Sequence, residues 1–417
     1  MKKSIRMAVA GKPVMHSLSP QIFACFPDDS FSYTRFAAGS AEEIFRFMED
    51  FNLDGINITS PFKQDVFNII KQKDDSALRA GAVNLLTSTA AGISGYNTDI
   101  NGAKEVAANF SKNDKIVIYG YGASARAAGM ALHERKIPFV FSGYGPDKGR
   151  QTAERLGKKF INENEIISFK PTAIMICIPR NIVPAFLNSL EAGTIIYDVN
   201  YNNPILSEAV QVRNLPYYDG LRWLFGQARE SARLITGSYP KAEIDIETII
   251  SRPEKIILTG FMGAGKNTIA KQLSDELGYE YADTDDLIAA GAGISIPEIF
   301  NNYGENEFRD LESRILNRIL DSRDRLLISA GGGIIERAEN HELIKERAMN
   351  IYLHASFDVC ESRINGSVRP LFKDRDTAAG LYQKRLYTYF DASDMSILNE
   401  GPVENCLKRL KDELSAL

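Results

Sequence analysis

The chain has few cysteines and no long apolar run. Four cysteines, Cys25, Cys177, Cys360 and Cys406, are scattered over 417 residues without a Cys-x-x-Cys pair. This pattern argues against a disulfide framework or a zinc site and predicts reduced, mostly buried thiols in a cytoplasmic protein. No apolar run approaches the roughly 20 residues of a membrane-spanning helix. The apolar stretch behind the basic N-terminus is short and broken, so we expect no secretory signal.

Basic charge is not in excess either. The net charge of −5 argues against broad binding to nucleic acids or anionic membranes, although local basic sites for anionic small molecules are compatible with it. Hydrophobic residues make up 44% of the chain and charged residues 25%, which predicts two or three soluble globular domains at this length. The sequence contains no internal repeat and does not indicate an oligomeric state.

Short apolar runs alternate with helix-like segments over the whole chain. The pattern is typical of parallel sheets built from β-α-β units and predicts an α/β fold. The expected strands are Met7–Ala10, Gly55–Ile58, Ala82–Leu85, Lys115–Tyr119, Phe139–Phe141, Ala173–Ile178, Thr194–Val199, Lys255–Thr259 and Leu326–Ala330.

A glycine-rich segment follows the expected strand Lys255–Thr259 and opens a helix-like stretch. Its sequence is Gly260-Phe261-Met262-Gly263-Ala264-Gly265-Lys266-Asn267-Thr268. This is the pattern of a phosphate-binding loop, whose backbone N–H groups point at phosphates while a lysine adds positive charge. We therefore predict that a nucleoside triphosphate binds here. Asn267 stands where Ser or Thr normally meets Mg2+, and its longer side chain puts the metal step in question because Mg2+ needs near-octahedral geometry.

Further motifs follow the loop in a fixed order. They are Asp283-Thr284-Asp285, Glu307-Phe308-Arg309, Gly331-Gly332-Gly333, the stretch Arg363 to Arg369-Pro370-Leu371, and Arg385. Taken singly, the aspartates are explained as helix caps and the arginines as surface charges. In this order, the motifs resemble shikimate kinase over residues 255–400.

The resemblance implies a kinase site. Shikimate would be bound by Asp285, Arg309, Gly332 and Arg385, and ATP by Gly263, Ala264, Gly265, Lys266, Asn267, Thr268, Arg363 and Arg369, with Asn267 and Asp283 at Mg2+. Arginine suits a planar carboxylate because its guanidinium can donate two parallel hydrogen bonds. Phosphoryl transfer depends on positioning and charge neutralisation, which these cations and one metal ion supply. A non-catalytic module that binds shikimate and nucleotide remains the alternative, and Asn267 alone favours it.

In the first half, a second glycine-containing turn follows the strand expected at 115–119. Its sequence is Gly120-Tyr121-Gly122-Ala123-Ser124-Ala125. Gly120 permits a tight turn, Gly122 lets the backbone approach a pyrophosphate, and Ala125 allows close packing of helix and strand. Polar motifs lie on either side of this turn: Ser17-Leu18-Ser19-Pro20, Asn57-Ile58-Thr59-Ser60-Pro61-Phe62-Lys63, Asn84, Gly95-Tyr96-Asn97-Thr98-Asp99, Asp198-Val199-Asn200-Tyr201, and Gly220 to Ala228. Together they resemble shikimate dehydrogenase over residues 5–237.

This second resemblance implies reduction of 3-dehydroshikimate to shikimate with NADP(H). The substrate would be bound by Ser17, Ser19, Thr59, Asn84, Asp99, Tyr201 and Gln227, and the cofactor by Gly120, Tyr121, Gly122, Ala123, Ser124 and Gly220. Lys63 would be the acid/base group with Asp99 as its partner, because an ammonium can stabilise the charge that develops on the ketone oxygen and supply the proton.

Two departures affect the cofactor side. Ser142-Gly143-Tyr144 stands where the family usually has Asn-Arg-Thr for the 2′-phosphate of NADP, with Lys148 and Arg150 further on. Ile176 to Arg180 replaces the usual Asn-Ala-Thr. We expect NADP, while a dehydrogenase that acts on quinate or another polyol acid with NAD remains an alternative.

Together the motifs predict three domains and a linker. Residues 1–105 would form an α/β substrate-binding domain, on which a helix over 220–245 packs back. Residues 106–219 would form a Rossmann NADP-binding domain, 246–254 the linker, and 255–417 a P-loop NTPase-type three-layer α/β kinase domain. Because the first half would make the compound that the second consumes, we predict a bifunctional enzyme of aromatic amino-acid biosynthesis.

Overall fold

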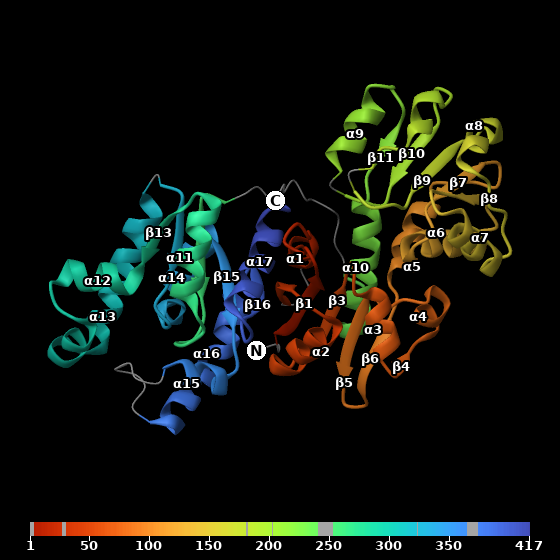
Figure 1. The fold of residues 1–417 in the computed structure, drawn as a ribbon. Helices are drawn as coiled ribbons and strands as arrows, with labels where there is room; N and C mark the ends of the chain where they lie inside the picture. The colour runs from red at the N-terminus through yellow and green to blue at the C-terminus, as the bar shows by residue number, and fades with distance from the viewer. Residues whose placement is uncertain are drawn as a thin grey trace. The chain divides into compact units, whose positions relative to one another are not determined.

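The fold is seen in a computed structural model of the chain (Figure 1). The structure describes residues 4–26, 31–180, 182–201, 203–240, 253–322, 324–364 and 374–417. The chain divides into two compact units. The first unit joins residues 1–20 and 30–62 to residues 247–417, and the second consists of residues 21–29 and 63–246.

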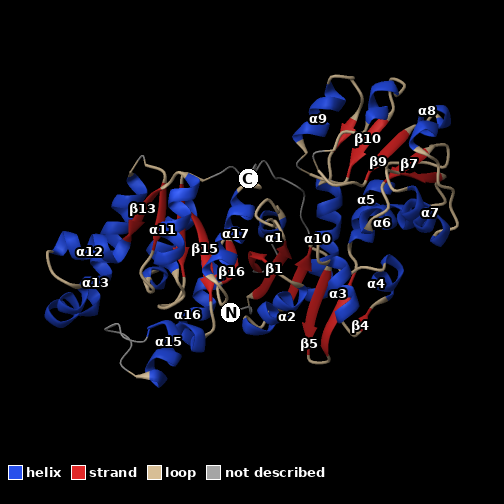
Figure 2. Ribbon diagram, viewed as in Figure 1, coloured by secondary structure: helices blue, strands red, loops and turns tan. Residues whose placement is uncertain are grey.

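A parallel sheet runs through the first unit, with strand order β13-β14-β12-β15-β16-β2-β1-β3 and helices around it (Figure 2). Its strands are β1 (Ile5–Gly11), β2 (Phe31–Ala37), β3 (Gly55–Ile58), β12 (Lys255–Thr259), β13 (Glu280–Asp283), β14 (Leu326–Ser329), β15 (Met349–His354) and β16 (Met395–Leu398). Strands β12, β14, β15 and β16 are buried along their whole length. Parallel strands covered on both faces are mostly apolar, which is why β12 and β14 were predicted from apolar runs, while β15 and β16, which contain Asn350, His354 and Ser396, were not.

The strands of the C-terminal half continue directly into those of the N-terminal segment. Strand β16 pairs in parallel with β2, with Met395 opposite Arg35 and Ile397 opposite Ala37. The predicted domain boundaries put residues 31–37 and 395–398 in separate domains, and their pairing was not predicted. The predicted domain boundaries themselves stay a prediction.

Helices cover this sheet. Helix α11 (Lys266–Leu277) packs against α17 (Val403–Leu414), and α16 (Arg375–Ala392) packs against β15 and β2. The first unit also contains α2 (Ala41–Asp50), α12 (Thr284–Ala292), α13 (Ile296–Asp321), α14 (Ala338–Arg347) and α15 (Phe357–Ile364). Helix α2 is capped by Ser40, whose side chain accepts from the Glu43 N–H, and its buried Phe47 stacks on Phe36 with ring centroids 3.9 Å apart.

In the second unit, β5 (Leu85–Thr89) and β6 (Gly92–Tyr96) form an antiparallel hairpin, and β4 (Gln72–Lys73) pairs with β6. The predicted strand Ala82–Leu85 is therefore misplaced, because Ala82 and Val83 are buried in the turn before β5. Helices α3 (Lys63–Ile69), α4 (Asp75–Ala80), α5 (Asp99–Ala107) and α10 (Leu221–Thr236) belong to this unit.

Helix α10 packs against α5. It ends at Gly237, which has a φ of 82° and caps the helix in the left-handed conformation. The helix is therefore shorter than the predicted 220–245. Residues 241–252, which include most of the predicted linker, lie outside the described residues.

A second sheet has five parallel strands in the order β11-β10-β9-β7-β8. Its strands are β7 (Ile116–Tyr119), β8 (Phe139–Ser142), β9 (Ala173–Ile176), β10 (Ile195–Asp198) and β11 (Tyr217–Tyr218). Between them run α6 (Ala123–Glu134), α7 (Pro146–Arg155), α8 (Ile166–Phe169) and α9 (Pro204–Gln211). The predicted α/β class is confirmed, with the β5–β6 hairpin as a departure from all-parallel sheets.

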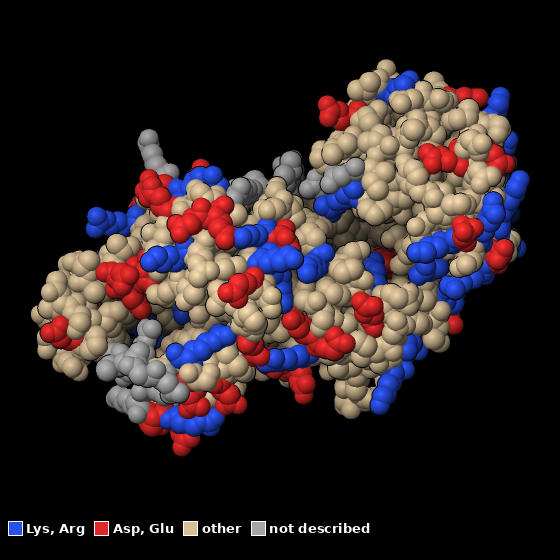
Figure 3. Space-filling view, in the orientation of Figure 1, with Lys and Arg blue, Asp and Glu red and all other residues tan. Residues whose placement is uncertain are grey.

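The thiols and the surface follow the composition. Cys177, Cys360 and Cys406 are buried and Cys25 is partly buried, all unpaired, as predicted. Burial raises the pKa of Cys360 to about 11 and that of Cys406 to about 12. On the face drawn in Figure 3, basic and acidic side chains are intermixed. None of the helices in the described ranges combines the length and the hydropathy needed to cross a bilayer.

Candidate active sites

The glycine loop joins β12 to α11 at the carboxyl edge of the parallel sheet. Gly263 has a φ of 82°, and a Cβ there would clash with the carbonyl oxygen of Cys360, so only glycine fits this turn. The buried ammonium of Lys266 donates to the carbonyl oxygens of Gly260 at 2.9 Å and Phe261 at 3.1 Å. Because α11 begins at this lysine, its N-terminal N–H groups can bind phosphate oxygens.

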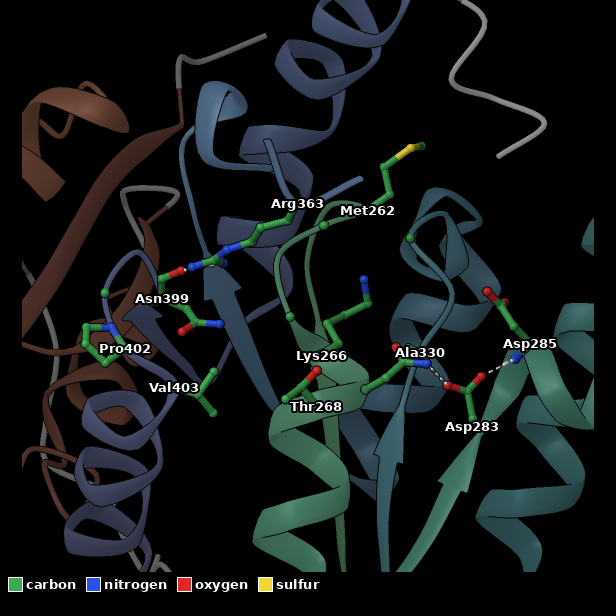
Figure 4. Close-up of a pocket in the computed structure, with 15 residues that line it drawn as sticks. Met262, Lys266, Thr268, Asp283, Asp285, Ala330, Arg363, Asn399, Pro402 and Val403 are labelled. Atoms are coloured by element: carbon green, nitrogen blue, oxygen red, sulfur yellow. Dashed lines mark hydrogen bonds between the residues drawn. The ribbon is translucent and has the colours of Figure 1, made fainter. Parts of the chain in front are cut away.

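A cavity of about 590 Å³ opens beside this loop. Figure 4 shows Lys266 and Thr268 at the loop end, with Asp283 and Asp285 to one side of them and Arg363 to the other. Residues predicted from separate motifs thus line one cavity. Its lining consists of Met262, Gly263, Gly265, Lys266, Asn267, Thr268, Asp283, Asp285, Ala330, Gly332, Arg363, Asn399, Gly401, Pro402 and Val403.

Asp283 ends β13 and is the N-cap of α12. Its Oδ1 accepts from the backbone N–H groups of Asp285 at 2.8 Å and Asp286 at 3.2 Å. Its Oδ2 accepts from the Tyr281 hydroxyl at 3.2 Å and from the side-chain amide of Asn267. The explanation of this aspartate as a helix cap is therefore confirmed, and its role at Mg2+ stays a prediction.

The amide of Asn267 is held at both ends. Its Oδ1 accepts from the Ser329 hydroxyl at 2.9 Å, and its Nδ2 donates to Asp283. The opposite orientation would set Oδ1 against the Asp283 carboxylate, so the charge of Asp283 decides the direction of the amide. The Asp283 carboxylate has the chemistry that Mg2+ needs. The amide of Asn267 presents a donor toward Asp283, and its predicted role at Mg2+ stays a prediction.

Two arginines converge on Glu336. Its Oε2 accepts from Arg385 Nη2 at 2.8 Å and from Arg309 Nη2 at 3.3 Å. Burial opposes the charge on Arg309, but Glu312, 2.8 Å away, and Glu336 outweigh it and raise the pKa of the guanidinium. Within the described residues, the buried Nε of Arg385 has no hydrogen-bond partner.

The glycines behind β14 make room for these side chains. A Cβ at Gly331 would lie 2.7 Å from Asp285 Oδ1, and one at Gly333 would clash with the guanidinium of Arg309. The missing side chains therefore let a carboxylate and a guanidinium approach the backbone next to the cavity.

Sequence reasoning missed one part of the cavity, the segment Asn399 to Val403 that follows β16. Asn399 Nδ2 donates to the carbonyl of Ala264 at 2.7 Å, and its own carbonyl accepts from Arg363 Nη1 at 2.8 Å. A polar residue directly after an apolar strand was the available signal, because ligands of open α/β sheets bind at the carboxyl ends of strands. Arg369, also predicted for this site, lies outside the described residues.

In the second unit, Lys63 and Asp99 form the predicted pair. Lys63 Nζ donates to Asp99 Oδ2 at 2.5 Å, and both side chains are largely buried. They start helices α3 and α5, so the backbone of two helices fixes them. Asn84 Nδ2 donates to Gln227 Oε1 at 3.3 Å, which brings two more predicted residues together.

Three other predicted substrate residues belong to the first unit. Ser17 and Ser19 are buried in the segment after β1, and their hydroxyls lie 3.1 Å apart. Thr59 follows β3, and its N–H donates to the carbonyl of Ala10 at 2.8 Å. All three therefore follow the carboxyl ends of neighbouring parallel strands.

The turn after β7 has the predicted form. Gly120 has a φ of 135°, and a Cβ there would clash with the carbonyl of Cys177, while Gly122 faces open space and is the N-cap of α6. Tyr121, Ala123 and Ser124 belong to the same turn and the start of α6. Gly220 donates its N–H to the Asn200 carbonyl at 3.1 Å, next to Tyr201, over which the guanidinium of Arg180 lies.

The end of β8, where the 2′-phosphate of NADP is expected, carries Ser142. Its hydroxyl is buried and, among the described residues, has no hydrogen-bond partner. Tyr144, Lys148 and Arg150 beyond it are exposed. The two cations are therefore accessible to a phosphate at this strand end.

Comparisons with known proteins match the two halves separately. Residues 262–415 match the family model described as shikimate kinase, and residues 9–86 match that described as shikimate dehydrogenase substrate binding domain. The shikimate kinase of Rhodopseudomonas palustris is 35% identical over 188 residues, covering 43% of this chain and 91% of that protein. The shikimate kinase of Geobacter sulfurreducens is 40% identical over 158 residues, covering 37% of this chain and 86% of that protein.

Solved structures share the fold of the first half. Shikimate 5-dehydrogenase from Thermus thermophilus, in complex with NADP(H) and shikimate, has a TM-score of 0.51 at 23% identity and covers 57% of this chain and 95% of its own. Quinate dehydrogenase from Corynebacterium glutamicum, in complex with NAD, has a TM-score of 0.50 at 22% identity with the same two coverages. The chain therefore belongs to the shikimate kinase family through its C-terminal half, and it joins this kinase domain to a shikimate dehydrogenase substrate-binding domain.

Proposed function

We propose that this chain catalyses two consecutive reactions. It would reduce 3-dehydroshikimate to shikimate with NADPH and then phosphorylate the 3-hydroxyl of shikimate with ATP. The observation that carries the proposal is the cavity beside the glycine loop, because residues from separate motifs line it in the arrangement that a phosphoryl acceptor and a triphosphate need.

In the kinase reaction, Lys266 and the loop N–H groups neutralise the phosphates of ATP. Arg309 and Arg385, which converge on Glu336, bind the carboxylate of shikimate. Asp283 is fixed by four hydrogen bonds and orients the attacking hydroxyl. Bound Mg2+, held by Asp283, supplies charge neutralisation at the phosphates.

In the dehydrogenase reaction, Lys63 donates a proton from Nζ to the carbonyl oxygen of the substrate, and Asp99 holds the ammonium in place. The Gly120 turn and the open space at Gly122 fit the pyrophosphate of a dinucleotide, so NADP would be held there. NADPH supplies the hydride. Asn84, Gln227, Ser17, Ser19 and Thr59 bind the hydroxyls and the carboxylate of the substrate.

A coupled assay on the whole chain tests both activities. It supplies 3-dehydroshikimate, NADPH, ATP and Mg2+, and follows NADPH loss and shikimate 3-phosphate formation. The expected result is both signals, with ATP-dependent product after NADPH oxidation. Absence of NADPH loss would refute the dehydrogenase, and absence of phosphorylation of added shikimate would refute the kinase.

A second candidate makes the kinase half a non-catalytic binding module. The observation that favours it is the Asn267 amide, which donates to Asp283 at the position where the motif normally has a shorter hydroxyl side chain. Asn267→Ser removes this bond and should lower the Mg2+ concentration for half-maximal ADP release by about tenfold, equivalent to ~1.4 kcal/mol. If neither the original chain nor this variant releases ADP at high Mg2+, the binding module is the correct function.

An alternative for the first half is a dehydrogenase for quinate or another polyol acid with NAD. The missing Asn-Arg-Thr segment at Ser142 favours it, and the fold is shared with both kinds of dehydrogenase. Rates with NADP and NAD on shikimate and quinate decide between them. We place the protein in the cytoplasm, because its four thiols are unpaired.

A further inference from the structure

The C-terminal half of the first unit contacts the segment that carries Ser17 and Ser19. This segment, residues 12–19, links β1 to α1 (Ser19–Ala24) and has little regular structure of its own. Figure 1 shows α17 near β1, and in the sheet β2 lies between β16 and β1. Two buried side chains contact the segment: Glu413 from the C-terminal half, and Arg35 from β2, which also bonds to Asp394 of the C-terminal half.

Glu413 lies on α17 and accepts two backbone hydrogen bonds from the segment. Its Oε2 accepts from the N–H of Val14 at 2.7 Å and from the N–H of Met15 at 2.8 Å. The side chain is fully buried, and its Oε1 has no partner among the described residues. Burying a carboxylate costs free energy of folding unless the group is hydrogen-bonded, so the two N–H groups stabilise Glu413. The same two bonds fix the position of α17 relative to Val14 and Met15.

Arg35 lies on β2 and holds the segment at Ser17. Its Nε and Nη2 donate to the carbonyl oxygen of Ser17 at 3.0 and 2.7 Å, while its Nη1 donates to the carbonyl of Asp394 at 3.2 Å. The N–H of Arg35 also donates to Asp394. One guanidinium therefore joins Ser17 to the residue that precedes β16.

We propose that Glu413 is a positioning residue for the dehydrogenase, and that the kinase half thereby holds the segment with Ser17 and Ser19 in its substrate-binding conformation. The inference rests on the proposed role of these two serines in binding shikimate. Ser17 lies in the irregular part of the segment and Ser19 is the first residue of the short helix α1, so local secondary structure alone does not fix the two hydroxyls. With two N–H groups and one carbonyl bonded to Glu413 and Arg35, the segment has a defined path.

Because Glu413 acts only on binding, its loss should change the dehydrogenase KM for shikimate and leave kcat unchanged. Glu413→Met keeps the length and the burial of the side chain but removes the acceptor. We expect it to raise the KM for shikimate about tenfold, the effect of losing hydrogen bonds of ordinary net strength. Glu413→Gln keeps an oxygen acceptor for both N–H groups and should restore a KM close to that of the original chain.

The experiment uses full-length chains and follows shikimate oxidation with NADP. Glu404→Gln, an exposed position on the same helix, is the matched control and should leave the dehydrogenase constants unchanged. Kinase activity on added shikimate, measured in the same preparations, reports whether each variant is folded. Hydrogen exchange of a peptide that covers residues 12–19 should be faster in Glu413→Met than in the other chains.

The outcomes separate this inference from the proposed function. If the original chain does not oxidise shikimate, the proposed dehydrogenase is wrong. If it does, while Glu413→Met keeps both the KM and the exchange rate, the positioning role is wrong. A fall in kcat for Glu413→Met and Glu413→Gln alike would also overturn it, because the acceptor would then not be the cause. If Glu413→Met lacks kinase activity, it is not correctly folded and a second variant, Arg35→Lys, decides. A dehydrogenase KM for shikimate equal to that of the original chain in Arg35→Lys would contradict the proposal.

Discussion

Glu336 lies where the carboxylate of shikimate is proposed to bind in the kinase half. It accepts hydrogen bonds from two buried arginines, Arg385 and Arg309, which are 2% and 7% exposed. Burial opposes ionisation of Glu336, but the hydrogen bond and charge of Arg385 outweigh it and lower its pKa. Glu336 is therefore negatively charged and competes with the substrate carboxylate for the same two guanidinium groups.

We predict that Glu336→Gln lowers the kinase KM for shikimate about tenfold. Two unit charges about 5 Å apart repel by about 3 kcal/mol at an effective dielectric constant of about 20. The Glu336 side chain is 22% exposed and can turn toward Lys384, whose Nζ lies 3.6 Å from its Oε1. We therefore expect only about half of this repulsion, ~1.4 kcal/mol, to weaken shikimate binding. That free energy corresponds to a factor of ten in the KM. The new amide oxygen can still accept from Arg385, so the arginine stays in place.

The assay measures kinase rates at varied shikimate with saturating ATP and Mg2+. Glu305→Gln is the matched control, because Glu305 also accepts from Arg309, at 3.1 Å, but its side chain is 51% exposed. Its effect should be about twofold or less, as for other exposed ion pairs. A KM for Glu336→Gln that is unchanged or higher would refute the reasoning, and a higher value would mean that Glu336 serves to hold Arg385 for the substrate.

Three further predictions concern other parts of the chain. Lys63→Met should lower the dehydrogenase kcat by about 10²- to 10⁴-fold, as expected for a general acid, and leave the kinase kcat of the same preparation unchanged. Gly333→Ala should raise the kinase KM for shikimate but not for ATP, because the added Cβ would displace the guanidinium of Arg309. Glu413→Gln should remove a pH dependence of stability. Burial raises the pKa of Glu413 from its usual 4.5 to about 7, so between these values the folded chain binds more protons than the unfolded chain. The free energy of unfolding should therefore fall by about 3 kcal/mol as the pH rises through this window. Urea unfolding at about pH 5 and pH 8 measures it, and an equal pH dependence in the variant would contradict the assignment.

The strands were predictable where burial and strand formation coincide. Gly55–Ile58 and Lys255–Thr259 have the predicted bounds, because buried parallel strands are apolar on both faces. The prediction for Ala82–Leu85 was wrong because Ala82 and Val83 are apolar for another reason, their burial in a turn. A short, mostly apolar run of four residues indicates that the residues are buried, but it does not distinguish a strand from a packed turn.

For the sites, local motifs were predictable and long-range contacts were not. The glycine loop is defined by backbone conformation within nine residues, so its sequence was sufficient. The pair Lys63–Asp99 required the resemblance, since nothing local connects two residues 36 positions apart. Glu336 and Glu413 went unnoticed, because their roles come from partners that only the tertiary fold brings near.

The pairing of β16 with β2 links the sheet of the kinase half to the substrate segment of the dehydrogenase. An edge strand exposes unpaired N–H and C=O groups and tends to pair with other chains. Here each strand covers the other, and the buried hydroxyls of Thr34 and Ser393, 2.9 Å apart, lie beside the pairing. A slip of one residue between β16 and β2 would move Asp394 by about 3.3 Å, away from the Arg35 guanidinium that donates to its carbonyl at 3.2 Å. The register that closes the sheet is therefore also the register that joins Arg35 to the residue before β16, so a chain that mispairs these strands should bind the dehydrogenase substrate more weakly even if its kinase cavity forms.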